Sequence, residues 1–277
     1  MKKITLGLFT VIFISILAAC GASGENEDTT DNDAATNESG ESANLYDQVM
    51  EEGVLTVGTE GTYAPFTFHN EEGELTGYDV EVIKEVAKRM GVEVDFQETQ
   101  WDSMFAGLNS ERFDLIANQV GINEDRLENY DFSIPYTYSS AVVVVPTEIN
   151  DITSFEDIEG RQSAQSLTSN YTTIAEENGA EVVGVEGLAQ AIELIKQGRA
   201  EVTVNDKLAV LDYINQQGDE SIKIVAEAED SSEMAFIFNK GNEELIDAIN
   251  EQLEAMREDG TLTEISQEWF GEDVSSK

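Results

Sequence analysis

Cysteine, histidine and proline are scarce in this chain of 277 residues. It has one cysteine, Cys20, so no disulfide can form within the chain and its stability must come from packing. A catalytic triad or a multi-histidine zinc site would depend on its one histidine, His69, which we place in a surface loop beside the 71–73 turn. We therefore expect neither a metal nor a cofactor.

Basic residues are also scarce: 15 Lys and Arg accompany 57 Asp and Glu, giving a formal net charge of −42. Such a surface repels the phosphates of nucleic acids, so we expect no nucleic-acid partner. Its self-repulsion destabilises the compact state unless salt screens it, because the Debye length falls to ~3 Å near 1 M ionic strength. We hypothesise a salty or alkaline habitat, in which the acidic residues serve solvation rather than catalysis.

Long apolar runs are absent apart from Ile4–Ala19, which follows Lys2 and Lys3 and ends in small residues. A basic start, a short apolar core and a small-residue end are typical of a secretory signal peptide, predicted here over 1–19. The run is too short for a comfortable span of ~20 residues. Its end, Leu-Ala-Ala-Cys, resembles the lipobox of bacterial lipoproteins, which implies a lipid on Cys20 and anchoring to the outer face of the cell membrane, with a monoderm host. The alternative is an ordinary signal that contains a cysteine.

The remaining chain divides into a polar segment and an alternating one. Residues 20–44 have no aromatic or large aliphatic side chain, so we expect a disordered acidic linker, with structure starting near Leu45. Beyond it, apolar spacing predicts alternating strands and helices, which argue for an α/β fold of two mainly parallel, doubly wound lobes with ligand chemistry in the crevice at the strands' carboxyl ends. The strands are predicted at 54–58, 92–96, 114–117, 141–145, 202–204 and 235–238, and the helices at 79–90, after an Asp102 N-cap, at 188–197, and from an Asn242 cap to Gly260.

Several motifs carry a resemblance to a known family. They are Gly77-Tyr-Asp-Val-Glu through Met90, Tyr63-Ala-Pro-Phe66, Asp114–Gly121 ahead of Glu124-Asp-Arg126, Tyr130–Tyr136, and Trp269-Phe-Gly271. Together they make residues 45–272 resemble the polar amino-acid solute-binding proteins of ABC importers, bacterial family 3.

The resemblance implies a periplasmic-binding-protein-like bilobal clamp joined by two crossover strands, near Tyr136–Val142 and Asp230–Met234. Lobe 1 would hold 45–137 plus 234–277, and lobe 2 would hold 138–233. It implies a monomer that is not an enzyme and that closes by hinge motion over an amino acid for an ABC permease in the membrane. Energy would come from a separate ATPase, since this chain has no Gly-Lys-Ser/Thr phosphate loop.

The resemblance also implies a set of ligand-binding residues. Arg126 matches the arginine that grips the α-carboxylate, a role that suits the two parallel bonds of a guanidinium. Asp206 matches the carboxylate that receives the α-ammonium. The alternatives are a surface arginine and a helix N-cap. The other expected residues are Glu60, Tyr63, Trp101, Asn118, Gln119, Gly121, Ser166, Thr168, Ser169, Asn170 and Asn205. For the two aromatics the alternative is core packing, and for residues 166–170 it is capping of a helix that begins near Tyr171.

The segments Ala117–Gly121 and Ser163–Tyr171 look most like members that bind L-cystine, which is therefore the expected ligand. Glutamine or arginine binding remains an alternative, as does a ligand-sensing receptor component. A dehydratase-like enzyme on the same fold would use Glu60 as acid or base, but no second catalytic group stands out.

Overall fold

The computed structural model describes residues 44–277. The predicted signal peptide (1–19), Cys20 and the linker up to residue 43 lie outside the described residues. The expected start near Leu45 is confirmed, because α1 (Leu45–Glu52) begins there and the Asn44 side chain accepts a bond from the Asp47 N–H as its N-cap.

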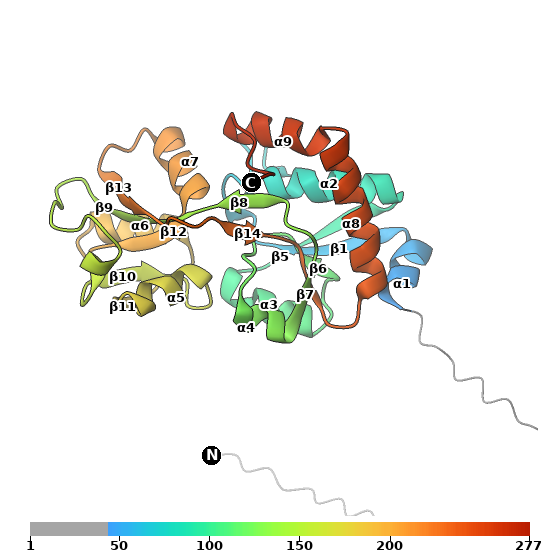
Figure 1. Cartoon of the computed structure of the whole chain (residues 1–277), viewed down its shortest axis with the longest axis horizontal. Coiled ribbons are helices and arrows are strands. Elements are labelled where there is room, and N and C mark those ends of the chain that lie inside the picture. Colours follow the sequence, from blue (N-terminus) through green and yellow to red (C-terminus); the bar gives the residue numbers. More distant parts are fainter. Residues whose placement is uncertain (1–43) are drawn as a thin grey trace, which may run out of the picture. The chain divides into compact units, whose positions relative to one another are not determined.

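Lobe 1 is built around a sheet in the order β5-β1-β6-β15-β7, with helices on both faces (Figure 1). Successive strand side chains point to opposite faces, so Leu115 packs with α2 and α8 while Ile116 packs with α3. A small sheet of β2, β3 and β4 adjoins it. The remaining elements of the lobe are β1 (Val54–Thr59), β2 (Thr62–Tyr63), β3 (Thr67–His69), β4 (Leu75–Thr76), α2 (Tyr78–Met90), β5 (Glu93–Glu98), α3 (Trp101–Asn109), β6 (Leu115–Ile116), α4 (Glu124–Asn129), β7 (Tyr130–Phe132), β15 (Ile237–Asn239), α8 (Glu243–Glu258) and α9 (Thr261–Phe270).

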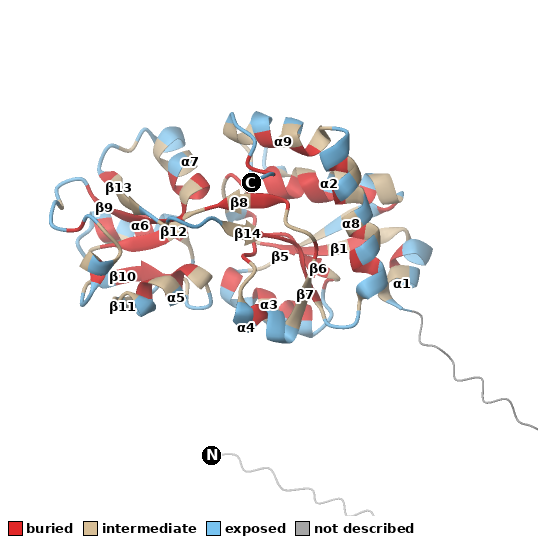
Figure 2. Ribbon diagram, in the orientation of Figure 1, coloured by how far each residue is buried: buried red, intermediate tan, exposed pale blue. Residues whose placement is uncertain are grey.

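Lobe 2 has a smaller sheet centred on β9 (Ala141–Pro146), which is buried along its whole length (Figure 2). Val142 and Val144 pack on the α6 side, and Val143 and Val145 on the α5 side, which explains its uninterrupted apolar sequence. A bridge between Ser163 and Val202 joins its β10-β11 and β12-β9-β13 strand groups. The other elements are a 3-10 turn (Glu156–Ile158), β10 (Gln162–Gln165), α5 (Asn170–Glu177), β11 (Glu181–Gly184), α6 (Leu188–Lys196), β12 (Thr203–Asp206), α7 (Lys207–Gln217) and β13 (Ile222–Glu227).

The chain passes between the lobes twice, through β8 (Thr137–Ser139) and back through β14 (Ser232–Met234), which pair antiparallel. The strand that follows each crossing runs against its neighbours: β9 against β12 and β13, and β15 against β6 and β7. The other described strands of each main sheet share one direction. The α/β bilobal class is therefore confirmed, and the residue limits of the lobes stay a prediction.

The predicted elements are mostly confirmed, with shifts of up to two residues at their ends. Residues 79–90 are all helical, and residues 188–197 are helical except Gln197. A left-handed Gly91 ends α2 as expected. Strand β12 starts one residue later than predicted and β15 two residues later. Asn242 is the N-cap residue of α8, but its amide donates to the Asn239 carbonyl and makes no side-chain cap bond.

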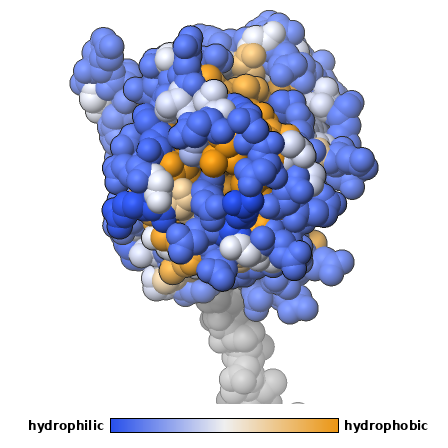
Figure 3. All heavy atoms as spheres, turned by 90° about the vertical axis from the view of Figure 1, so that its left-hand side faces the viewer, coloured by the Kyte–Doolittle hydropathy of each residue, from blue (hydrophilic) through white to orange (hydrophobic). Residues whose placement is uncertain are grey.

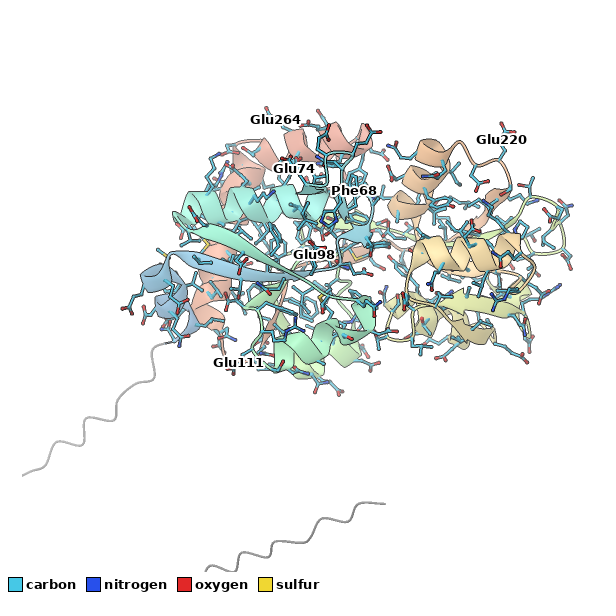
Figure 4. All side chains as sticks on the ribbon, turned by 180° about the vertical axis from the view of Figure 1, so that it is seen from behind. Phe68, Glu74, Glu98, Glu111, Glu220 and Glu264 are labelled. Atoms are coloured by element: carbon cyan, nitrogen blue, oxygen red, sulfur yellow. The ribbon has the colours of Figure 1, made fainter. Side chains whose placement is uncertain are left out.

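Two local predictions are wrong. Gln100, not Asp102, is the N-cap residue of α3, and Asp102 lies in the first turn, where its carboxylate contacts lobe 2 instead of its own helix. His69 is exposed as expected, but it ends strand β3 rather than lying in a loop. Its imidazole lies 3.2 Å from the Glu98 carboxylate, labelled in Figure 4. Among residues 44–277, no helix is both long and apolar enough to cross a membrane.

Candidate ligand-binding cavity

A cavity lies between the lobes and is lined by residues from both of them. Its walls come from the ends of parallel strands: Glu60 follows β1, Asn118 follows β6, and Ser166 follows β10. This is the crevice expected for doubly wound lobes. The lining residues are Glu60, Thr62, Tyr63, Trp101, Asn118 and Gln119 from lobe 1, and Ser166, Ser169, Asn170, Tyr171, Gly187, Leu188 and Asn205 from lobe 2.

Most of the residues predicted to bind the ligand line this cavity, while Gly121, Arg126, Thr168 and Asp206 lie just behind it. Arg126 and Thr168 line a neighbouring cavity, together with Ser169 and Asn170, which line both. Thr62, Tyr171, Gly187 and Leu188 line the first cavity without having been predicted. Tyr171 was within reach of sequence reasoning, because it follows the predicted Asn170; Gly187 and Leu188 carry no sequence signal for this role.

Arg126 is a buried cation, not a surface residue, and is 8% exposed. Its Nη1 donates to the Gly121 carbonyl (2.8 Å) and its Nη2 to the Thr168 carbonyl (3.3 Å). The guanidinium also lies over the rings of Trp101 and Phe105, at 5.5 and 5.2 Å. No described carboxylate pairs with it, and burial lowers the pKa of Arg126 to about 10. The site therefore holds a positive charge that a ligand anion can neutralise.

Asp206 caps a helix with one oxygen, which is the alternative considered for it, and bonds with the other oxygen to two residues that line the cavity. Its Oδ1 caps α7, accepting from the N–H groups of Leu208 (2.8 Å) and Ala209 (3.2 Å). Its Oδ2 accepts from the Tyr171 hydroxyl (2.9 Å) and the Gln119 amide (3.4 Å), both of which line the cavity. The carboxyl is fully buried, which raises its pKa. A ligand cation beside it would favour its ionised form.

Glu60 supplies a second carboxyl, held by Asn118. The Asn118 Nδ2 donates to Glu60 Oε2 (2.9 Å), and its Oδ1 accepts from the Glu60 N–H (2.7 Å). Burial, assisted by the negative charge of Asp102, raises the pKa of Glu60 to about 7. Two acidic groups, Glu60 in the cavity wall and Asp206 behind it, thus accompany the buried guanidinium of Arg126.

Direct bonds join the lobes on two flanks of the cavity. Tyr63 Oη donates to Asn205 Oδ1 (2.8 Å), and its ring packs on Phe66. Contact of Tyr63 with a ligand side chain stays a prediction. On the other flank, Asp102 Oδ1 accepts from the N–H (3.1 Å) and the hydroxyl (2.9 Å) of Thr168. These contacts describe a closed arrangement of the two lobes.

Comparison with known structures agrees with a closed arrangement. The chain superposes on the L-cystine solute receptor of Neisseria gonorrhoeae, in an unliganded open conformation, with a TM-score of 0.58 at 47% identity, covering 85% of this chain and 100% of that one. An ancestral arginine-binding protein bound to arginine gives a TM-score of 0.75 at only 34% identity, covering 79% and 99%. The ligand-bound structure fits better although its sequence is less similar.

Sequence comparison extends the likeness over the whole chain. The L-cystine-binding protein TcyA of Bacillus subtilis (strain 168) is 54% identical over 276 residues, covering 99% of this chain and all of the relative. Residues 55–272 match the sequence pattern of the bacterial extracellular solute-binding proteins, family 3. Together with the two lobes and the cavity between them, these likenesses show that the chain belongs to family 3 of the bacterial extracellular solute-binding proteins.

Proposed function

We propose that this protein captures L-cystine outside the cell and delivers it to an ABC importer. The observation that carries the proposal is the arrangement of charge around one closed cavity: an unpaired buried guanidinium, Arg126, behind one part of the wall and the buried Asp206 behind another. Arg126 would bind the α-carboxylate of an amino acid and Asp206 its α-ammonium. The L-cystine-binding relatives in Bacillus subtilis and Neisseria gonorrhoeae support cystine as the amino acid.

Glu60 favours a ligand with a second cationic end. L-Cystine consists of two amino-acid heads joined by a disulfide, so its second ammonium can meet the Glu60 carboxyl while neutral donors such as Ser166 and Asn170 are available to its second carboxylate. Arginine would also satisfy Glu60 with its guanidinium. Glutamine would leave this carboxyl, whose pKa is raised to about 7, facing a neutral amide.

Calorimetric titration of the purified protein against a panel of amino acids tests the proposal. We expect tight binding of L-cystine, and tight binding of glutamine or arginine with no response to cystine would overturn it. The chain offers a clean control: because it contains no disulfide, a thiol reductant changes only the ligand, splitting cystine into two cysteines. The heat of binding should fall when the reductant is added, and restoring an oxidised ligand should restore it.

A lipid anchor would hold the protein at the membrane, so that cystine is released close to the importer. We propose that the thiol of Cys20 is lipidated and that residues up to 43 link this anchor to α1, with a monomeric clamp of lobe 1 (45–137 plus 234–277) and lobe 2 (138–233) that binds and does not catalyse. The Leu-Ala-Ala-Cys sequence supports the anchor. Cys20→Ala should move the protein from the membrane fraction to the medium, and unchanged membrane association would contradict the anchor.

A further inference from the structure

Asp79 is a buried carboxylate that the binding site does not use directly. It lies in the first turn of α2, is fully buried and does not line the cavity. Its Oδ2 accepts two hydrogen bonds, from the backbone N–H of Gln119 and from the hydroxyl of Tyr136 (2.7 Å), while its Oδ1 has no partner. A carboxylate in a first helical turn ordinarily serves its own helix. This one joins two distant segments instead.

The first of these segments is the loop that follows β6 and reaches the cavity. Gln119 has a φ of +50°, a left-handed conformation that is unfavourable for a residue with a side chain and persists only where its surroundings hold it. In that conformation the N–H of Gln119 donates a hydrogen bond to the Asp79 carboxylate. The Gln119 side chain then points across to Asp206 of lobe 2 (3.4 Å).

The second segment is the pair of crossing strands. Tyr136 directly precedes β8, and its ring stacks on Phe236, with centroids 4.4 Å apart, just beyond β14. Its N–H also donates to the Met234 carbonyl (2.9 Å), and its own carbonyl accepts from the Tyr78 hydroxyl (2.8 Å). Tyr136 is therefore fixed to both strands that pass between the lobes, and Asp79 touches it directly.

We propose that Asp79 is a positioning residue that couples the crossing strands to the ligand cavity, by holding Gln119 toward Asp206 in register with Tyr136. The inference rests on the proposed function in that Gln119 and Asp206 belong to the binding site. Asp79 never meets the ligand: it acts through the N–H of Gln119. Its two bonds require acceptor lone pairs and not a charge, because neither donor is a cation.

Three variants separate this role from general structural support. Asp79→Asn keeps an acceptor oxygen in nearly the same place. It also imitates the neutral carboxyl that predominates below pH about 7, since burial raises the pKa of Asp79 to about 7, with Asp206 as the charged neighbour. Tyr136→Phe removes only the bond on the strand side. Asp79→Ala removes both bonds. As a matched control, Asp114→Asn alters a half-buried carboxylate that binds the Thr56 N–H (2.7 Å) away from the cavity.

The experiment measures L-cystine affinity by calorimetry, together with the melting temperature, in the full chain. We expect Asp79→Ala to weaken binding about tenfold or more, Tyr136→Phe about fivefold, and Asp79→Asn less than threefold, in line with single hydrogen bonds to a carboxylate. Asp114→Asn should leave the affinity unchanged. The Tyr136→Phe and Gln119→Ala effects should also be non-additive, because both act on one chain of contacts.

Results of two kinds overturn the inference. One is a Tyr136→Phe variant that melts lower yet binds as wild type, which would make the network purely structural. The other is additivity of Tyr136→Phe with Gln119→Ala. If Asp79→Ala fails to fold, the volume-conserving Asn and Phe variants still decide. Failure of the proposed function is visible separately, because wild type would then not bind cystine; the same variants are then compared with the amino acid that it does bind.

Discussion

At the scale of single residues, the cavity concentrates groups that folding alone would disfavour. Arg126 keeps its charge without a carboxylate partner, and burial raises the pKa of Glu60. Groups held in this way lower stability and are retained where they bind something. Replacing such a group is therefore expected to raise the stability of the ligand-free protein while weakening ligand binding.

We predict that Arg126→Met strongly weakens amino-acid binding but raises the melting temperature of the ligand-free protein. The lowered pKa of Arg126 means that the native state disfavours the charged form, so an apolar side chain removes this penalty at neutral pH. The affinity loss should be on the order of 2–5 kcal/mol, because a ligand carboxylate is left unpaired. Calorimetry and thermal melts measure the two effects.

Arg161→Met is the matched control for this substitution. Arg161 is a partly buried arginine outside the cavity with ion pairs to Asp151 and Glu201, so its loss should leave affinity unchanged and not raise the melting temperature. An Arg126→Met protein that binds within threefold of wild type would remove Arg126 from the site.

Glu60 gives a pH prediction. The pKa of Glu60 is raised from 4.5 to about 7, so its contribution to stability is complete below pH 4.5 and is lost as the pH rises through 7. Glu60→Gln cannot ionise, and we expect it to melt higher than wild type above pH 7 with little or no such advantage at pH 5. Thermal melts between pH 5 and 8.5 measure the difference, with the exposed Glu264→Gln as control. A pH-independent difference would rule out titration of Glu60 as the cause.

At the scale of helices and strands, the sequence predicts most elements, because each depends on local spacing and end signals. Val82, Val86 and Met90 mark a helix by their periodicity, and Gly91 ends it. The uninterrupted β9 likewise follows from burial on both faces. Asp102 is different: its sequence position suits a cap, but its partner, Thr168, is 66 residues away in lobe 2. A contact between lobes leaves no local pattern.

The same limit applies to the site. The expected roles of Arg126 and Asp206 come from family motifs, whereas Asp79 is recognised only by the bonds it makes to distant residues. No local pattern predicts that one carboxylate, Asp206, both caps α7 and bonds to Gln119 in the cavity wall. Asp206 can do both because it ends β12, directly before the first residue of α7 and beside the residues that line the cavity.

The Asp102–Thr168 contact should act as a latch on ligand release. We predict that Asp102→Ala speeds ligand dissociation about fivefold, as the loss of about 1 kcal/mol in an exposed site implies, without changing the melting temperature of the ligand-free protein. Stopped-flow fluorescence measures the rate. The chain contains a matched control in Asp157, which accepts from the N–H (2.8 Å) and hydroxyl (2.9 Å) of Thr153 within lobe 2.

Asp157→Ala should lower the melting temperature and leave the dissociation rate as in wild type, because its bonds do not cross between lobes. Equal dissociation rates for wild type and Asp102→Ala would show that this flank does not hold the ligand in.

At the scale of the whole molecule, charge dominates. The formal net charge is −42, and acidic side chains such as Glu111, Glu220 and Glu264 point outward from the ribbon (Figure 4). The end formed by lobe 2 is likewise mostly hydrophilic, with apolar side chains visible near its middle (Figure 3). Most of the described lysines form ion pairs, for example Lys196 with Asp219 and Lys240 with Asp131. The acidic residues far outnumber the basic ones, so most carboxylates have no basic partner and repel one another.

We predict that the melting temperature rises steadily with NaCl between 0.05 and 1 M, because screening of this excess weakens its repulsion over that range. Differential scanning calorimetry measures it, and sucrose at matched osmolality serves as the control that does not screen charge. A midpoint that is indifferent to NaCl would contradict a role for repulsion and, with it, the hypothesis of a salty habitat.

The two charged groups at the cavity should have different fates in a gene copy released from selection for binding. Asp206 would persist, because its Oδ1 still caps α7, whereas Arg126 would be lost early, because no described carboxylate neutralises its buried charge. The equivalent of Arg126 is therefore the better sign that a relative still binds an amino acid. A relative that keeps Asp206 but lacks Arg126 is expected to keep the fold and to have lost ligand binding.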